Sequence, residues 1–381
     1  MAALTLGTPE EVGMDPRRID ALHQRAPEWI HPQRMRSAVL LAARRGKVVF
    51  HEAWGPLTWR QGSAPMQKDS IFRVASITKP MTSTAAMMLV EDGRLGLNRP
   101  IKEYLPEICG EGADAVEVQH LFTHTSGFEE EEADERFWAL PSDPSLAARD
   151  LEYGLHPLVG RYLSCLWDLP CHGTPGSKMT YSDPNYNLLG EIVRRVSGMA
   201  LQDFAKARIF DPLTMKDTCY FRDEAKLDRI VCRRKDLVLP DGVWGADGLN
   251  VTAMDLAAFG QMFLDKGKSG GRHLLSPAGV HEMTRNQIPG VGTEFLGYHE
   301  EASWGLGWAV QHDERWKWIG GTLPPKGTFY HMGAGGLCLW VDPINEIVGV
   351  YLSVCLEIDE NMEHHWNLDL FQNMVTASVI D

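Results

Sequence analysis

The sequence has 381 residues, 44% hydrophobic and 23% charged, a composition typical of an ordinary folded protein with ample apolar material for a core. Its formal net charge of −14 argues against a nucleic-acid partner, since phosphate backbones are bound by Lys and Arg. No charged and apolar leader opens the sequence and no apolar stretch is long enough for a membrane span, so we expect a cytoplasmic protein without a membrane partner.

The first predicted elements are two strands, residues 37–43 and 47–54. Apolar residues dominate both segments, and residues 44–46 between them end in glycine. Two short β-like runs joined by such a turn are typical of a hairpin. We therefore expect the N-terminal region to supply part of a sheet.

The next element places Ser76 and Lys79 three residues apart, just before the apolar run 80–93, which ends in glycine. That run predicts a helix, with Pro80 tolerated in its first turn. Residues i and i+3 share a helix face, so the hydroxyl and the amine can meet as a nucleophile and its activator. The spacing alone is equally compatible with a capping Ser and a solvated Lys at an exposed helix start.

A second element overturns that plain interpretation. Tyr181 follows the turn-forming residues 175–180 and precedes 185–196, where apolar residues at 188, 189, 192, 193 and 196 fit a helical period. The predicted helix would hold the loop that carries Tyr181. A tyrosine held in place can transfer a proton.

The C-terminal part contains further predicted elements. Residues 252–255 resemble a capping box that opens a helix through Phe263. The β-like run 330–342 carries His331 and several glycines, and 343–345 joins it to a strand at 346–355. This second hairpin can pair with the first, and a helical segment over 359–375 can cover the sheet.

Three of these elements resemble, in this order, the active-site motifs of the serine β-lactamase and penicillin-binding-protein superfamily. They are the Ser76–Lys79 spacing, the loop of Tyr181 and the run 330–342 with His331. Within it the chain is most similar to the class C β-lactamase-related branch, which contains family VIII carboxylesterases, D-aminopeptidases, D,D-peptidases and lovastatin-type acyltransferases. The segments 72–79, 92–97, 121–128, 248–252 and 304–308 are also family-like, so the resemblance covers most of the chain.

The resemblance implies an α/β (α+β) fold with an antiparallel sheet flanked by helices. Residues 1–80 and 241–381 would form a discontinuous α/β domain, 81–240 an inserted helical subdomain, and the active site would lie between them. It also implies a Ser76 acyl-enzyme, with Lys79 and Tyr181 as the general-base pair. The backbone N–H groups of Ser76 and Ala334 would form the oxyanion hole. The expected partner is a small-molecule ester or acyl substrate, without a cofactor.

Two positions depart from the usual motifs. Asp183 stands where Tyr-x-Asn has an amide, which places a carboxylate beside the Lys and the substrate carbonyl. His331 stands where β-lactamases often have Lys, as in esterase-like members, so we expect β-lactam hydrolysis at most as a side activity. We expect Asp183, His331 and Gly333 to contact substrate. Most of the 12 tryptophans are expected in the core, with lining roles for Trp308 and Trp340.

Several alternatives stay open. An acyltransferase that moves an acyl group from a thioester to an alcohol is the nearest, followed by a D-amino-acid amidase or peptidase and by an acyl-binding sensor without turnover. A Ser-His-Asp arrangement with His124 and Ser126 lacks the G-x-S-x-G elbow, and a structural role is expected for both residues. His364 and His365 lack metal-ligand spacing, so we predict no metal. The acidic run 129–132 is expected to be a solvated loop.

Overall fold

The computed structural model describes residues 4–32, 34–141, 154–232, 242–312, 321–355 and 366–381. Its centre is a seven-stranded sheet whose neighbours all pair antiparallel, except that β1 runs parallel to β3. The strand order across the sheet is β1 (Thr5–Leu6), β3 (Lys47–Trp54), β2 (Met35–Arg44), β11 (Ile347–Cys355), β10 (Leu337–Asp342), β9 (Phe329–Gly333) and β8 (Ala309–Val310). The mixed fold with a mainly antiparallel sheet is thus confirmed.

Both predicted hairpins are present, and β11 of the second pairs with β2 of the first, as expected. The interpretation of 330–342 as one β-like run was wrong, because the chain reverses at 334–336 to form β9 and β10. Gly335 and Gly336 have φ of 91° and 82° there, a left-handed backbone that favours glycine. The glycines therefore make a tight turn within the run.

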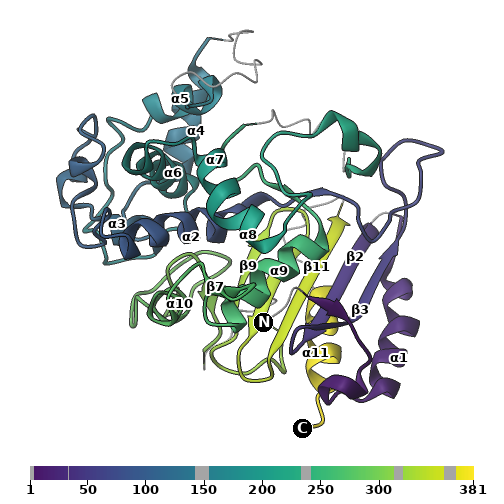
Figure 1. The fold of residues 1–381 in the computed structure, drawn as a ribbon. Coiled ribbons are helices and arrows are strands. Elements are labelled where there is room, and N and C mark those ends of the chain that lie inside the picture. The colour runs from purple at the N-terminus through teal and green to yellow at the C-terminus, as the bar shows by residue number, and fades with distance from the viewer. Residues whose placement is uncertain (1–3, 33, 142–153, 233–241, 313–320, 356–365) are drawn as a thin grey trace.

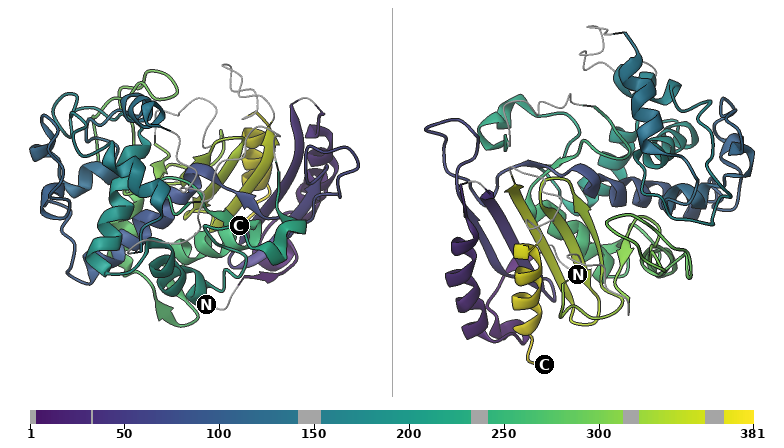
Figure 2. Two further views of the ribbon diagram at one scale, coloured as in Figure 1. Left: turned by 90° about the horizontal axis from the view of Figure 1, so that it is seen from above. Right: turned by 180° about the vertical axis from the view of Figure 1, so that it is seen from behind.

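Helices cover both faces of the sheet. The helix α9 (Ala253–Leu264) lies in front of it in Figure 1, whereas the view from behind in Figure 2 shows α1 (Pro16–Arg25) and α11 (Trp366–Ala377) on the opposite face. Alternate residues of β2 serve the two sides: Val39 and Leu41 join the core under α9, and Leu40 joins the core under α1 and α11. A strand buried on both faces reads as a continuous apolar run, which explains its sequence.

The remaining helices lie mostly to one side of the sheet (Figure 1). They are α2 (Thr78–Glu91), α3 (Val118–Phe122), α4 (Glu130–Ala139), α5 (Pro157–Ser164), α6 (Asp183–Ser197), α7 (Leu201–Ala205), the π-helical turn Lys206–Phe210, α8 (Asp211–Leu213) and α10 (Pro277–Thr284). Short 3₁₀ turns lie at Glu10–Val12, Ala26–Trp29, Ala75–Ile77, Ile101–Glu103, Ala113–Ala115 and Glu224–Arg229. Two small sheets pair β4 (Phe72–Arg73) with β5 (Asn250–Val251) and β6 (Lys268–Ser269) with β7 (Arg272–His273).

The predicted helices near the site are confirmed. The helix α2 ends just before Gly93, whose φ is 71°, and α6 buries Leu188, Leu189 and Ile192. One hydrophobic cluster contains both Leu41 of the sheet and Ile192 of α6, so the core is continuous between sheet and helices. The division into domains at 81 and 240 stays a prediction.

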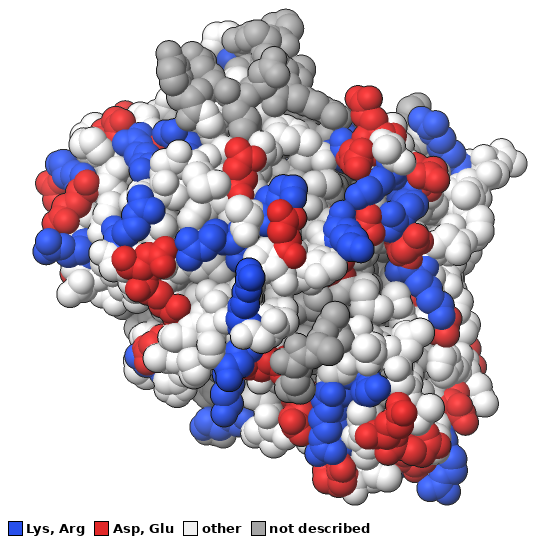
Figure 3. All heavy atoms as spheres, in the orientation of Figure 1, with Lys and Arg blue, Asp and Glu red and all other residues white. Residues whose placement is uncertain are grey.

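The surface in Figure 3 carries acidic and basic side chains interspersed over the face shown. Ion pairs such as Arg229 with Asp217 and Lys206 with Asp211 contribute to this mixture. Within the described parts of the chain, no helix has the length and apolarity that crossing a membrane requires.

Candidate active site

Ser76 lies in a strained turn between β4 and α2. Ala75, just before it, is a non-glycine residue with φ of 48°, and Ser76 and Ile77 complete one 3₁₀ turn before the α-helix begins. A left-handed residue costs conformational energy and persists only where its surroundings hold it. The half-buried Ser76 is therefore fixed in direction at the start of a buried helix.

The segment 245–251 holds this turn from the other side. The pairing of β4 with β5 continues as a hydrogen bond from Val74 N to Leu249 O (2.9 Å) and one from Leu249 N to Thr78 Oγ1 (3.2 Å). One helical turn further on, Thr82 Oγ1 donates to Gly245 O at 2.7 Å. These bonds fix the start of α2 against a neighbouring backbone segment.

Lys79 is fully buried and donates three hydrogen bonds. Its Nζ lies 2.9 Å from Ser76 Oγ, 2.6 Å from Asp183 Oδ1 and 3.2 Å from Ala246 O. Burial by itself lowers the pKa of the amine, but the charge of Asp183, with Tyr181, outweighs burial and raises that pKa above its usual value. Lys79 is accordingly an ammonium group in the resting site, bonded to the predicted nucleophile.

Tyr181 is held between two rings just ahead of α6. Its ring stacks on His124 with centroids 4.3 Å apart and on Phe295 at 4.4 Å. The Lys79 ammonium lies 4.9 Å from the centroid of this ring, and Lys79 and Ser76 both act to lower the pKa of the phenol. Burial raises the pKa of Tyr181 although Lys79 opposes it, so the resting group is a neutral phenol. The structure thus brings together the three predicted catalytic residues.

His331 lies on β9, on another side of Tyr181. The two ring centroids are 6.3 Å apart, and His331 Nδ1 donates to Met332 O at 2.8 Å, which makes Nε2 the acceptor nitrogen. Burial, followed by the charge of Lys79, lowers the pKa of His331 to about 3. The imidazole is consequently neutral at physiological pH and offers no positive charge to a substrate.

The residues after His331 place β9 against the nucleophile turn. Gly333 packs on the Val74 carbonyl so closely that a Cβ would overlap it. Ala334, the predicted second donor of the oxyanion hole, follows at an exposed position in the β9–β10 turn. Its role as a donor stays a prediction.

Glu130 is a neighbour that the sequence analysis missed. Its Oε2 accepts the Asp183 backbone N–H at 3.0 Å, and burial, followed by the charge of Asp183, raises the pKa of Glu130 to about 7. It belongs to the run 129–132, which was expected to be a solvated loop but begins the helix α4. The sequence offered no signal for the contact, because 53 positions separate the two residues.

His124 supports the loop of Tyr181. It has a left-handed backbone with φ of 56°, its Nδ1 accepts the Ser182 N–H at 3.0 Å, and its carbonyl accepts the Thr180 N–H at 2.8 Å. Ser126 donates instead to Asn185 Oδ1 at 2.6 Å. These contacts fit the expected structural role of both residues.

The expected lining roles of Trp308 and Trp340 disagree with where the structure places them. Both indoles are fully buried, Trp308 among Phe259, Phe263 and Phe329, and Trp340 against Phe371. These side chains therefore fill the core and do not line the site.

The indole at the site belongs to Trp304. It makes T-shaped contacts with Tyr181 (5.9 Å), His124 (5.3 Å) and His331 (5.6 Å) between ring centroids. Tryptophan positions alone did not distinguish it from the two core residues, because the distinction depends on the rings from distant segments that each indole packs against.

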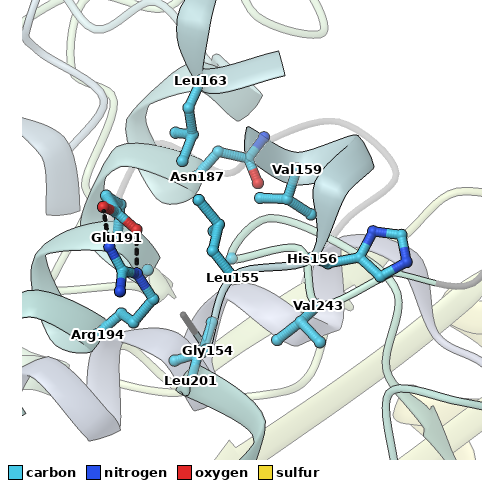
Figure 4. Close-up of a pocket in the computed structure, with 12 residues that line it drawn as sticks. Gly154, Leu155, His156, Val159, Leu163, Asn187, Glu191, Arg194, Leu201 and Val243 are labelled. Carbon is cyan, nitrogen blue, oxygen red and sulfur yellow. Dashed lines mark hydrogen bonds and ion pairs between the residues drawn. The ribbon is translucent and has the colours of Figure 1, made fainter. Parts of the chain in front are cut away.

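A cavity in the helical part, drawn in Figure 4, is too small for a substrate. Its volume is about 10 Å³, room for one water, and apolar side chains such as Leu163 and Val243 line it beside the Glu191–Arg194 ion pair. His364 and His365 lie outside the described residues. Within the described ranges, no three His, Cys, Asp or Glu side chains cluster as a metal site requires.

Comparison with known proteins places this geometry in a family. The sequence profile named Beta-lactamase matches residues 19–372. The chain belongs to the beta-lactamase family. This assignment confirms the expected resemblance and makes the chain an enzyme of the serine hydrolase kind.

Individual relatives agree with the assignment. Protein Rv1367c of Mycobacterium tuberculosis is 32% identical over 326 residues, which cover 76% of this chain and 78% of that protein. Esterase EstB of Burkholderia gladioli is 33% identical over 216 residues, 52% of this chain and 50% of the esterase. Among solved structures, EstCE1, described as a hydrolase with promiscuous acyltransferase activity, has a TM-score of 0.72 at 22% identity and covers 94% of this chain and 98% of its own. That last similarity shows the fold.

Proposed function

We propose that the chain is a serine carboxylesterase that acts on small-molecule esters through a Ser76 acyl-enzyme. The observation that carries the proposal is the buried Lys79 ammonium 2.9 Å from Ser76 Oγ and 4.9 Å from the centroid of the Tyr181 ring. A serine hydroxyl is a weak nucleophile unless a neighbour accepts its proton. Here two proton-exchanging groups meet the nucleophile, and the reaction needs no cofactor.

In the first step Ser76 Oγ attacks the ester carbonyl carbon and its proton passes to the Lys79/Tyr181 pair. The C–Oγ bond forms, and the carbonyl oxygen gains the negative charge. The backbone N–H groups of Ser76 and Ala334 are the proposed donors to that oxyanion, and such a donor typically contributes about 10²–10³ in rate. When the bond from carbon to the leaving oxygen breaks, the pair returns the proton and an alcohol departs.

In the second step water attacks the acyl carbon of the Ser76 ester. The water gives a proton to the same pair, the C–Oγ bond breaks, and Ser76 Oγ regains a proton. The carboxylic acid leaves and the resting site is restored. The Lys79/Tyr181 pair therefore acts as the general base in both halves of the reaction.

The base is best described as a coupled pair. The resting pair holds an ammonium and a phenol, because the charge of Asp183 raises the pKa of Lys79 against burial, and burial, with Asp183, raises the pKa of Tyr181. It must lose one proton to become a base, and groups in such close contact titrate together. Activity should therefore rise toward alkaline pH.

Esters are favoured over β-lactams and D-amino-acid amides with a free carboxylate. A substrate carboxylate requires a cation, but His331 is neutral and the Lys79 ammonium is fully buried beside Asp183. The similarity to the esterase EstB supports the same choice. Acyl transfer to an alcohol is the second candidate, supported by the described promiscuity of EstCE1.

The test is hydrolysis of p-nitrophenyl esters of increasing acyl length at pH 7 to 9, with intact-protein mass spectrometry of quenched samples. We expect turnover and an acyl adduct in the native protein, neither in Ser76→Ala, and about 10²–10⁴-fold slower turnover in Tyr181→Phe. Ser164→Ala, an exposed position on α5, is the matched control.

The possible results separate the alternatives. Turnover by Ser76→Ala would remove Ser76 as the nucleophile. An adduct without turnover would indicate a sensor, and product formation only with an added alcohol would indicate a dedicated transferase. An absence of both adduct and turnover with every ester would favour an amidase.

A further inference from the structure

Glu130 and Asp183 form a linked pair of carboxyl groups beside the nucleophile. Glu130, in the first turn of α4, accepts the Asp183 N–H at 3.0 Å, and the Asp183 carboxylate accepts the Lys79 ammonium at 2.6 Å. Lys79 in turn contacts Ser76 at 2.9 Å. Glu130 is thus linked to the nucleophile Ser76 by a chain of contacts through Asp183 and Lys79.

The charges around this pair do not balance. The charge of Lys79 attracts the Glu130 carboxylate, but the Lys79 ammonium is already paired with the Asp183 carboxylate. Asp134 on the same helix also acts on Glu130 and adds a further carboxyl group, which receives a bond from the Tyr162 hydroxyl of α5 at 3.4 Å. The ionised carboxylate of Glu130 therefore adds negative charge that the described side chains facing it do not neutralise.

The rest of the site supplies acceptors and not cations. The Asp183 side chain keeps 31% of its surface exposed, whereas Lys79 has none, so an arriving molecule meets the carboxylate and not the ammonium. His331 is neutral, and its buried acceptor Nε2 has no hydrogen-bond partner among the described residues. A buried acceptor of this kind can receive a hydrogen bond from a donor on a bound molecule.

We propose that Glu130 is a specificity-determining residue which, with Asp183, makes the site prefer esters that carry a cationic amine on the acyl chain. This inference rests on the proposed ester hydrolysis and names its substrate class. A carboxylate at the same place on the acyl chain is repelled, and a neutral chain is intermediate. For unit charges about 7–10 Å apart at an effective dielectric constant of about 40, between the values for a protein surface and for bulk water, the preference of ammonium over neutral should be roughly three- to tenfold.

A purely structural role for Glu130 makes a different prediction. If its only task were to accept the Asp183 N–H, Glu130→Gln would preserve the function, since Gln also offers a side-chain oxygen. The variant removes the charge and keeps the acceptor. The ratio of rates between charged and neutral substrates therefore separates the two roles.

The experiment compares acylation by three p-nitrophenyl esters of similar length: 6-aminohexanoate, heptanoate and the monoester of pimelate. We expect native kcat/KM to fall in that order. In Glu130→Gln the ratio of aminohexanoate to heptanoate should fall by roughly three- to tenfold. Glu131→Gln, an exposed neighbour in the same helix, is the control in which that ratio should stay at its native value.

The pH dependence of the ratio is a second readout that a structural role would not move. The aminohexanoate ammonium stays charged between pH 6 and 8, while Glu130 ionises near pH 7 because burial and Asp183 raise its pKa. The native ratio should rise across this range and stay level in Glu130→Gln. Added salt should reduce the native ratio by screening.

Equal ratios in the native protein and Glu130→Gln would overturn the proposal while leaving ester hydrolysis intact. So would a native preference for heptanoate at every pH. Acylation of Ser76 by none of the three esters would overturn the proposed function and, with it, the substrate class.

Discussion

Lys79 in α2 and Arg44 at the end of β2 are both fully buried cations, but their surroundings differ. Arg44 donates to five acceptor atoms: Val12 O at 2.6 Å, Gly13 O and Asn345 O at 2.8 Å, and Asp381 Oδ1 at 2.5 Å and O at 3.4 Å. Three of these acceptors are the peptide carbonyls of Val12, Gly13 and Asn345, which never change protonation. Arg44 therefore ties segments together and has no group available for chemistry.

Lys79 has the same degree of burial but different acceptors. It donates to one backbone carbonyl, of Ala246, and its other partners are the hydroxyl of Ser76 and the carboxylate of Asp183. Both of those partners can change protonation or bonding. The comparison teaches that burial of a cation does not identify a catalytic group, whereas the chemistry of its acceptors does.

The largest expected effect is a loss of activity when Lys79 is replaced. Lys79→Met removes the cation and keeps an apolar chain of similar length, and we expect kcat to fall by about 10²–10⁴ because the proton-transfer pair is lost. Ester turnover together with a circular dichroism spectrum checks that activity is lost from a folded protein. Lys178→Met, an exposed lysine paired with Glu294, is the control. Native-like turnover of Lys79→Met would contradict a catalytic role.

The second effect is a loss of stability when Arg44 is replaced. Arg44→Met leaves buried carbonyls without donors, and we expect a loss of about 2–4 kcal/mol in the free energy of unfolding, with kcat/KM preserved below the melting transition. Urea denaturation and ester kinetics at low denaturant measure the two quantities. A loss of kcat/KM in the still-folded variant would contradict the separation of structural and catalytic cations.

A third prediction tests whether Asp183 sets the pH at which the Lys79/Tyr181 pair becomes a base. Asp183 raises the pKa of both Lys79 and Tyr181, so Asp183→Asn should lower the pKa at which the pair becomes a base. The ascending limb of kcat/KM against pH should then move to lower pH, by about one unit. Asp247→Asn, a carboxylate next to Ala246 that pairs with Arg73, is the matched control. An unchanged limb in Asp183→Asn would contradict the coupling.

The smallest effect concerns stability at Glu130. Its pKa is raised from 4.5 to about 7, so the folded protein holds a proton that the unfolded chain releases, and stability falls as pH rises between these values. Glu130→Gln removes that penalty. Its unfolding free energy relative to native should rise from pH 4.5 to 7 and then level off, by about 1 kcal/mol after allowance for solvent screening. Urea denaturation at pH 5 and 8 measures it, and a difference independent of pH would contradict it.

Much of the fold could be predicted because it depends on local patterns. Hairpins with turn residues and helices with apolar periods are short-range features, and the pairing of β11 with β2 followed from two exposed hairpin edges. The i, i+3 spacing of Ser76 and Lys79 likewise predicted their contact, now seen at 2.9 Å. In each case neighbouring residues decide the geometry.

The missed features depend on long-range packing. Glu130 meets Asp183 only because α4 begins beside the start of α6, and the acidic run gave no sign of that contact. Trp308 and Trp340 lie in the core while Trp304 contacts Tyr181, a difference set by the rings that distant segments bring to each indole. The turn at 334–336 was hidden because glycine serves both close packing and chain reversal.

The hydrogen bonds between 245–251 and the start of α2 bear on how the protein can be redesigned. Changes in that segment would alter the position of Ser76 itself, so residues such as Gly245 and Leu249 are poor targets for random libraries. Phe295 stacks on Tyr181 from another loop, and Tyr298 nearby is 75% exposed. Because Phe295 holds the ring of Tyr181, diversity introduced at the exposed Tyr298 alone leaves both the nucleophile turn and Tyr181 undisturbed, which makes that position the better starting point for directed evolution.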